Sequence, residues 1–141
     1  MKWFDRQFDF TIPTDQADVI CHRLRHTPAR LQQLLMHAPG SALDQKPAGK
    51  WSVKEHVGHL SVLEPLWRVR FADIGRNKEM LTPTDLDNRA TSEAGFNHYP
   101  LAALLDRFLE ERTTTLTMIS SLNMRDNAHV SLHPRLQQKM R

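Results

Sequence analysis

The fold is decided by the stretch Gly49–Phe71, which reads GKWSVKEHVGHLSVLEPLWRVRF. Near its start, Ser52 and Glu55 have the spacing of a capping box. In this motif the serine oxygen accepts the backbone N–H of the acidic residue, and the carboxylate accepts the backbone N–H of the serine. A capping box marks a helix start, so we expect one long helix that begins at about Val53.

One face of this predicted helix is apolar. With about 100° of rotation per residue, this face carries Val53, Val57, Leu60, Trp67 and Phe71. Glu64 lies within the same stripe, where an unpaired carboxylate would be costly to bury. We therefore expect Glu64 to have a partner, and this is either an arginine in a buried ion pair or part of a functional site.

His59 lies at the edge of the apolar stripe, one turn before Leu63. A side chain at such an edge can face a pocket rather than packed hydrocarbon. Two interpretations stay open: His59 is a half-buried, hydrogen-bonded residue, or it is a ligand in a functional site.

The chain before this stretch contains a predicted helix break. Thr27 and Pro28 form a helix start, since proline is favoured at the first helical position and disfavoured deeper in a helix. We expect a short helix before the break and an amphipathic helix over residues 28–38. His22 and His26 are four residues apart and could share a metal, but the break that follows them favours a solvated surface.

The chain after this stretch contains a long connection and another helix. Residues 75–99 are polar and show no sustained period, so we expect at most a turn or two of helix there. Connections of this length are unusual in a compact domain and are often functional. Pro100 then opens a helix with apolar residues at helical spacing as far as Leu122, whereas residues 123–141 show no helical stripe.

The composition predicts one domain, residues 1–141, whose 40% hydrophobic residues are enough for one core. The net charge of +3 comes from 19 basic and 16 acidic residues scattered along the chain, so we expect no nucleic-acid partner. The single cysteine, Cys21, allows no internal disulfide and suits a reducing cytoplasm. There is no signal-peptide pattern and no apolar run near the ~18 residues of a membrane span, so we expect a cytoplasmic protein without a membrane partner.

The predicted helices leave one side of a bundle uncovered. Residues 1–13 alternate aromatic and polar side chains, which indicates an extended arm over an apolar surface. A four-helix bundle buries four apolar stripes, and we find three strong core helices before Arg141. Two explanations are open: the chain is a truncated form of a longer protein, or it completes its bundle by association as a homo-oligomer.

A family resemblance rests on four segments, which read MKWFDRQFDFTIP, RLRHTPARLQQLL, KPAGKWSVKEHVGHLSVLEPLW and LHPRLQQKM. Together they resemble the DinB-like superfamily of bacterial four-helix proteins, which are sometimes described as metal-dependent hydrolases. The segment around GKWSVKEHVGHL is the most specific. The resemblance implies an all-α four-helix bundle with a long crossover, whose last helix would lie beyond Arg141.

The resemblance also implies a divalent metal, zinc or nickel, held by three histidines. His59 occupies the position of the ligand in the second helix, and the other two ligands belong to the last helix. Because one imidazole cannot hold such a metal usefully, we expect an incomplete site in this chain. His129 and His133 are four residues apart and are weaker candidates for the missing ligands, and Glu64 would orient a ligand or accept a proton.

Two classes of function follow. The resemblance implies hydrolysis, or transfer of a low-molecular-weight thiol, with a metal-activated nucleophile and an unidentified small-molecule substrate. The alternative is a non-catalytic helical module, stress-associated or binding a small apolar ligand, that holds no metal. In this alternative His59 and Glu64 form a buried polar pair.

Overall fold

Three long helices dominate the part of the chain that the computed structural model describes, which is residues 14–122, 130–136 and 139–140. They are α1 (Ala17–Leu35), α3 (Val53–Gly75) and α5 (Leu101–Ser121). The shorter elements are the 3-10 turns η2 (Thr14–Gln16) and η3 (Phe96–His98), the helices α2 (Gly40–Leu43) and α4 (Arg89–Ser92), and the strands β1 (Ser131–Leu132) and β2 (Lys139–Met140). The predicted all-α class is confirmed, and only the two-residue strands depart from it in the described residues. The predicted arm over residues 1–13 lies outside them.

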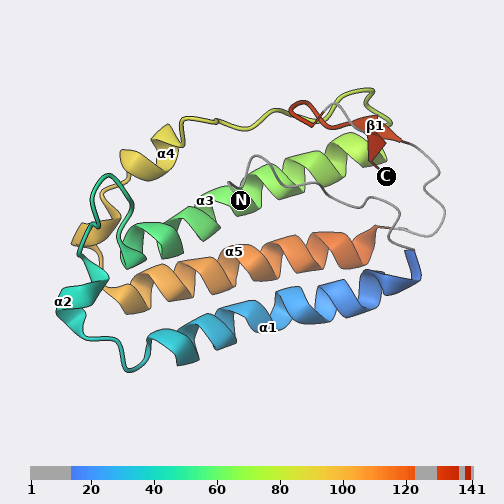
Figure 1. Ribbon diagram of the computed structural model, residues 1–141. Coiled ribbons are helices and arrows are strands. Elements are labelled where there is room, and N and C mark those ends of the chain that lie inside the picture. Colours follow the sequence, from blue (N-terminus) through green and yellow to red (C-terminus); the bar gives the residue numbers. More distant parts are fainter. Residues whose placement is uncertain (1–13, 123–129, 137–138, 141) are drawn as a thin grey trace.

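The long helices lie side by side, with α5 between α1 and α3 (Figure 1). α3 and α5 run in the same direction, and α1 runs against both (Figure 1). Parallel neighbours cannot be joined by a short turn, so residues 76–100 return along α3 and carry α4 and η3 with them. These residues form the long crossover that the family resemblance implied.

The start of α3 is held by the predicted capping box. Ser52 Oγ accepts the backbone N–H of Glu55 at 3.1 Å, and Glu55 Oε2 accepts the backbone N–H of Ser52 at 2.9 Å. Ser52 also donates to Asn97 Oδ1 at 2.6 Å, which ties this end of the helix to η3. The helix begins at Val53, as predicted.

The predicted break at Thr27 and Pro28 is wrong, because α1 continues through both residues. Pro28 has no backbone N–H and cannot bond the carbonyl of Leu24, one turn earlier. Arg112 of α5 supplies the missing donor, since its Nη1 lies 3.3 Å from the carbonyl oxygen of Leu24. A tertiary hydrogen bond therefore replaces the helical one, and Pro28 itself is buried.

The core lies where α3, α5 and η3 meet. Val57, Phe96 and Leu104 are each 2% exposed and pack together, with Leu31 and Leu35 of α1 against them. The helices therefore bury their apolar faces around α5, which contacts both α1 and α3.

Trp67 departs from the predicted core stripe, because its side chain is 39% exposed. It lies about 80° around the helix from Val57, which packs against α5. That edge of the stripe therefore points away from the core. The guanidinium carbon of Arg70 lies 5.4 Å from the centre of the Trp67 ring and covers part of it.

Polar contacts join the end of α3 to the C-terminal segment. Asp73 is 1% exposed and accepts hydrogen bonds from Thr82 N at 2.7 Å and Thr82 Oγ1 at 2.6 Å. Lys78 Nζ lies 2.7 Å from Asp73 Oδ1, and Ser131 of β1 donates to the Lys78 carbonyl at 2.7 Å. Hydrogen bonds rather than an apolar stripe thus hold β1 against the start of the crossover.

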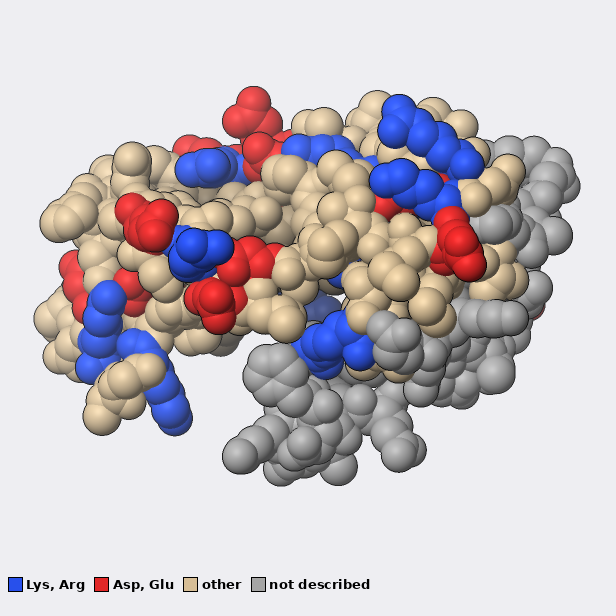
Figure 2. Space-filling view, turned by 90° about the horizontal axis from the view of Figure 1, so that it is seen from above, with Lys and Arg blue, Asp and Glu red and all other residues tan. Residues whose placement is uncertain are grey.

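Charged side chains are mixed on the face that carries the crossover. Lys and Arg groups lie among Asp and Glu groups and do not gather in one field (Figure 2). Among the described helices, none has the length and apolar character needed to cross a membrane.

Gly58→Ala should destabilise the protein, because a Cβ at this position would overlap the ring of Phe96. Overpacking of this kind costs about 1–3 kcal/mol. Gly75→Ala is the matched control in the same helix, since a Cβ there meets nothing within 4 Å. Thermal unfolding should show a lower Tm for Gly58→Ala alone, and equal Tm values for the two variants would contradict the close approach of η3 to α3.

Asp73→Asn should remove a stabilising effect that depends on pH. Hydrogen bonds from Lys78 and Thr82 lower the pKa of Asp73 from 3.8 to about 2. Because the pKa of Asp73 is lower in the folded than in the unfolded protein, the stabilisation by its ionised carboxylate is fully present above about pH 4. This stabilisation is lost as the pH falls towards 2. Urea unfolding at pH 7 should show a loss of about 1–2 kcal/mol in the variant, and this difference should shrink in acid.

Asp106→Asn is the control for this experiment, because Asp106 is exposed on α5. Its unfolding free energy at pH 7 should equal that of the parent protein. A difference between Asp73→Asn and the parent that is unchanged from pH 7 to pH 2 would contradict the assignment.

Candidate functional site

The candidate site lies between α3 and the crossover. His59 Nδ1 is 2.8 Å from Thr91 Oγ1 of α4, and Thr91 is 1% exposed. The ring of Trp51 lies against the His59 ring, with 4.7 Å between the two ring centres. The imidazole of His59 is therefore half-buried and held in position from two sides, as the first interpretation of this edge residue supposed.

A cavity of about 140 Å³ opens beside His59. Val62, Leu63 and Leu66 of α3 form its apolar wall, and the crossover supplies most of its polar lining. Asp85 belongs to this lining, and its carboxylate accepts the backbone N–H of Asp87 at 3.0 Å and that of Arg89 at 2.8 Å. These two bonds shape the turn that leads into α4 and so place Thr91 beside His59.

The environment of His59 favours the neutral imidazole. Burial lowers the pKa of His59, and the nearby His56 lowers it further. A neutral imidazole can bind a metal or accept a proton, whereas an imidazolium can do neither. Nδ1 is occupied by Thr91, and Nε2 has no hydrogen bond to any described residue.

Glu64 is paired with an arginine in the interior. Its Oε1 receives Arg112 Nε at 2.8 Å and Arg112 Nη2 at 2.6 Å. Glu64 is 1% exposed, and the Arg112 guanidinium also lies over the ring of Phe108, 5.0 Å from its centre. Of the two partners expected for Glu64, the structure contains the arginine of a buried ion pair.

His59 and Glu64 face different sides of α3. Five residues correspond to a rotation of about 140° in a helix, so His59 faces the crossover and Glu64 faces α5. Their partners are Thr91 and Arg112, and Glu64 does not line the cavity. The buried polar pair between His59 and Glu64, expected for a non-catalytic module, is therefore not formed.

His133 lies near the other end of α3. Its Nε2 is 3.3 Å from Arg70 Nη1, and its Nδ1 accepts the backbone N–H groups of Arg135 and Leu136 at 3.3 and 3.2 Å. Arg70 follows His59 by eleven residues, which is about 16 Å along the helix axis. The fold thus uses His133 to close a turn and does not bring it to His59. His129 lies outside the described residues.

His22 and His26 are exposed on α1, on the solvated surface that the sequence favoured. Their ring centres are 4.2 Å apart, and His26 Nδ1 lies 2.8 Å from the carbonyl oxygen of His22. They are separate from the His59 cavity, whose lining comes from α3 and the crossover.

The described residues do not fit a complete metal site. Among them, no group of three or more His, Cys, Asp or Glu side chains is arranged to hold a metal ion. His59 can supply one ligand, whereas a zinc site normally has at least three protein ligands. Any such site would need ligands in addition to those described.

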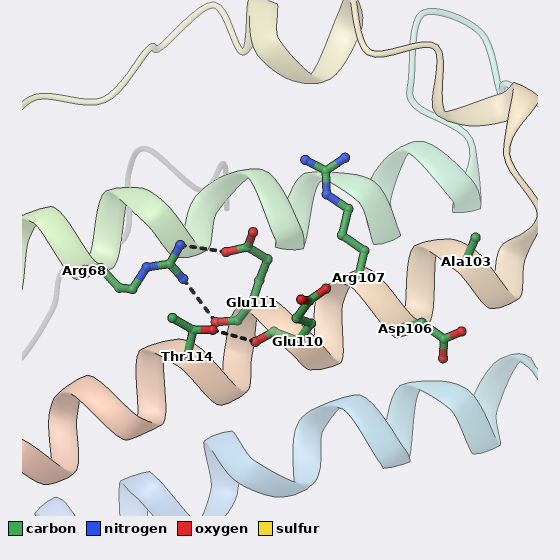
Figure 3. A pocket seen from close by; sticks show the side chains of 7 residues that line it. All are labelled: Arg68, Ala103, Asp106, Arg107, Glu110, Glu111 and Thr114. Carbon is green, nitrogen blue, oxygen red and sulfur yellow. Dashed lines mark hydrogen bonds and ion pairs between the residues drawn. The ribbon is translucent and has the colours of Figure 1, made fainter.

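A second hollow, of about 720 Å³, lies on the outer surface of α5. Figure 3 shows Arg68 extending from α3 towards Glu111, with 2.7 Å between Arg68 Nη2 and Glu111 Oε2. The remaining lining residues are Ala103, Asp106, Arg107, Glu110 and Thr114, all exposed on α5. Because this lining is solvated and Arg68 and Glu111 are paired with each other, the His59 cavity is the better candidate for chemistry.

Thr91 and Asp85 were not identified from the sequence. The only signal for them was the unusual length of the polar connection in which they lie. Their role depends on the path of the crossover, which returns along α3 and brings Thr91 to His59, 32 positions earlier in the chain.

Comparisons with known proteins agree with the observed fold. The sequence model of the DinB superfamily matches residues 23–139. The structure is similar to that of YfiT from Bacillus subtilis, described as a probable metal-dependent hydrolase with an unusual four-helix bundle topology. The TM-score is 0.76 at 21% sequence identity, and the match covers 96% of this chain and 78% of that one. No curated protein matches the chain significantly.

Arg112→Met should destabilise the protein strongly, because it leaves the buried Glu64 carboxylate and the Leu24 carbonyl without their shared donor. Removal of one partner of a buried ion pair costs about 3–5 kcal/mol. The double variant Glu64→Leu with Arg112→Met should lose less than the sum of the single changes, because it leaves no buried charge. Arg107→Met, exposed on the same helix, is the control. Chemical denaturation measures the stability of Arg112→Met, Glu64→Leu, the double variant and Arg107→Met. Equal stability of Arg112→Met and Arg107→Met would contradict the pairing.

Proposed function

Because the chain belongs to the DinB superfamily, we propose that it is a metal-dependent hydrolase in which His59 is one of the metal ligands. The observation that carries this proposal is the state of His59. Its imidazole lies at the wall of a cavity, is oriented through Nδ1 by a buried threonine, and keeps Nε2 clear of described protein partners. Hydrogen bonding of one ring nitrogen to orient the other is the usual arrangement of a metal-binding histidine.

The proposal requires ligands other than those described. His59 has no second His, Cys, Asp or Glu group around it that would complete a site within residues 14–122, 130–136 and 139–140. Zinc or nickel would both suit an imidazole ligand. Hydrolysis is preferred to transfer of a low-molecular-weight thiol because the similar structure is described as a probable hydrolase.

Glu64 has a structural role in this proposal. Its carboxylate is bound to Arg112 and lies about 140° around α3 from His59. A direct part in orienting a ligand or accepting a proton at the cavity would require it to leave that ion pair.

The second candidate is a non-catalytic module that binds a small ligand. The mixed lining of the 140 Å³ cavity favours it, because apolar walls with a few polar groups are typical of binding sites. In this case His59 and Thr91 would form hydrogen bonds with the ligand, and no metal would be needed.

Metal content distinguishes the two candidates. Purified protein should contain about one equivalent of divalent metal per chain, and His59→Ala should lose it. The control is the double variant His22→Ala with His26→Ala, which removes the surface pair that could bind metal adventitiously. Loss of metal in the double variant but not in His59→Ala, or no metal in any preparation, would reject the metal-dependent proposal in favour of the second candidate.

A further inference from the structure

The middle of α3 contains two buried polar side chains, Ser61 and Glu64. Ser61 Oγ and Glu64 Oε2 have no hydrogen-bonding partner among the described residues, and both residues are 1% exposed. Buried polar groups are rarely left unpaired in folded proteins, because each loses its hydrogen bonds to water without replacement. These two atoms therefore require a partner.

The two atoms belong to one turn of helix. Ser61 and Glu64 are three residues apart, so their Cβ atoms lie about 5–6 Å from each other on one face. The next residue is Pro65, which has no backbone N–H and cannot bond the Ser61 carbonyl. A hydroxyl group, a carboxylate oxygen and a backbone carbonyl that lacks its helical donor are thus gathered in this turn.

Arg112 cannot serve these atoms. Its Nε and Nη2 both bind Glu64 Oε1, at 2.8 and 2.6 Å, and its Nη1 reaches the carbonyl that Pro28 leaves without a donor in α1. Rotation of the guanidinium towards Glu64 Oε2 would break the contact with Leu24. The three-helix arrangement itself therefore leaves one carboxylate oxygen without a donor.

We propose that an ordered water molecule bridges Glu64 and Ser61 inside the protein. Water has two O–H donors and two acceptor sites, so it can donate to Glu64 Oε2 and to the Ser61 carbonyl while it accepts from Ser61 Oγ. Three hydrogen bonds are typical of a buried water. A cation is disfavoured, because Glu64 and Arg112 already balance each other and an additional buried charge would have no counterion.

The water completes the hydrogen bonding of the Ser61–Glu64 turn, where α3 meets Arg112 of α5. It is independent of the His59 cavity, because Ser61 and Glu64 line no part of that cavity. The bridging water is therefore expected whether or not the protein binds a metal.

A crystal structure at high resolution tests the proposal directly. The expected result is one density peak within hydrogen-bonding distance of Glu64 Oε2 and of a Ser61 oxygen, with a water–amide NOE at the backbone N–H groups of residues 61–64 and 66 in solution. Density that shows Ser61 Oγ bonded directly to Glu64 Oε2 with nothing between them would overturn it. A peak surrounded by six or more oxygens at about 2.3–2.6 Å, as for a bound calcium ion, would also overturn it.

Ser61→Val provides the matched variant, because valine removes the hydroxyl and places a methyl group where the water would lie. The water–amide NOE should disappear in Ser61→Val and persist in Ser120→Ala, which removes an exposed serine of α5. Persistence of the NOE in a folded Ser61→Val protein would overturn the proposal. If this variant does not fold, the NOE and the density in the parent protein still decide the question.

Discussion

The three long helices are joined by one guanidinium group. Arg112 of α5 binds the Glu64 carboxylate of α3 and the Leu24 carbonyl of α1, and its plane covers Phe108. A buried charge is costly unless its hydrogen bonds are satisfied, so these contacts restrict how the helices can slide or rotate. Pro28 contributes to the same constraint, because it frees the carbonyl that Arg112 uses.

The parallel course of α3 and α5 has a direct consequence for the site. Parallel neighbours need a long crossover, and this crossover returns along α3 on the side away from α5 (Figure 1). It therefore covers the face that carries His59 and supplies Thr91 and Asp85 to the cavity. The ion pair and the candidate site lie on different faces of one helix. Substitution of a residue in the ion pair therefore removes no side chain of the site, and substitution in the site removes no side chain of the ion pair.

The elements that the sequence predicted well are those governed by local interactions. The capping box at Ser52 and Glu55 involves atoms three residues apart, and α3 begins where it indicates. The start of α5 after Pro100 follows from local proline chemistry in the same way, and the irregular crossover follows from a polar stretch without a sustained helical period. The family resemblance was also carried by contiguous segments, and the family match confirms it.

The predictions that failed concern contacts between distant residues. Pro28 predicted a helix break because its lost hydrogen bond counts against a helix, but Arg112, 88 positions from Leu24, replaces that bond. Trp67 has the spacing of a core residue, yet its side chain is exposed. The neighbouring elements decide which part of the wide apolar face of α3 is covered. By itself, the sequence determined the starts of α3 and α5, the family and the candidate ligand His59. Only the tertiary structure decided the partners of Glu64, His59 and His133, because each partner lies on another element, and which elements meet depends on how the helices and the crossover pack.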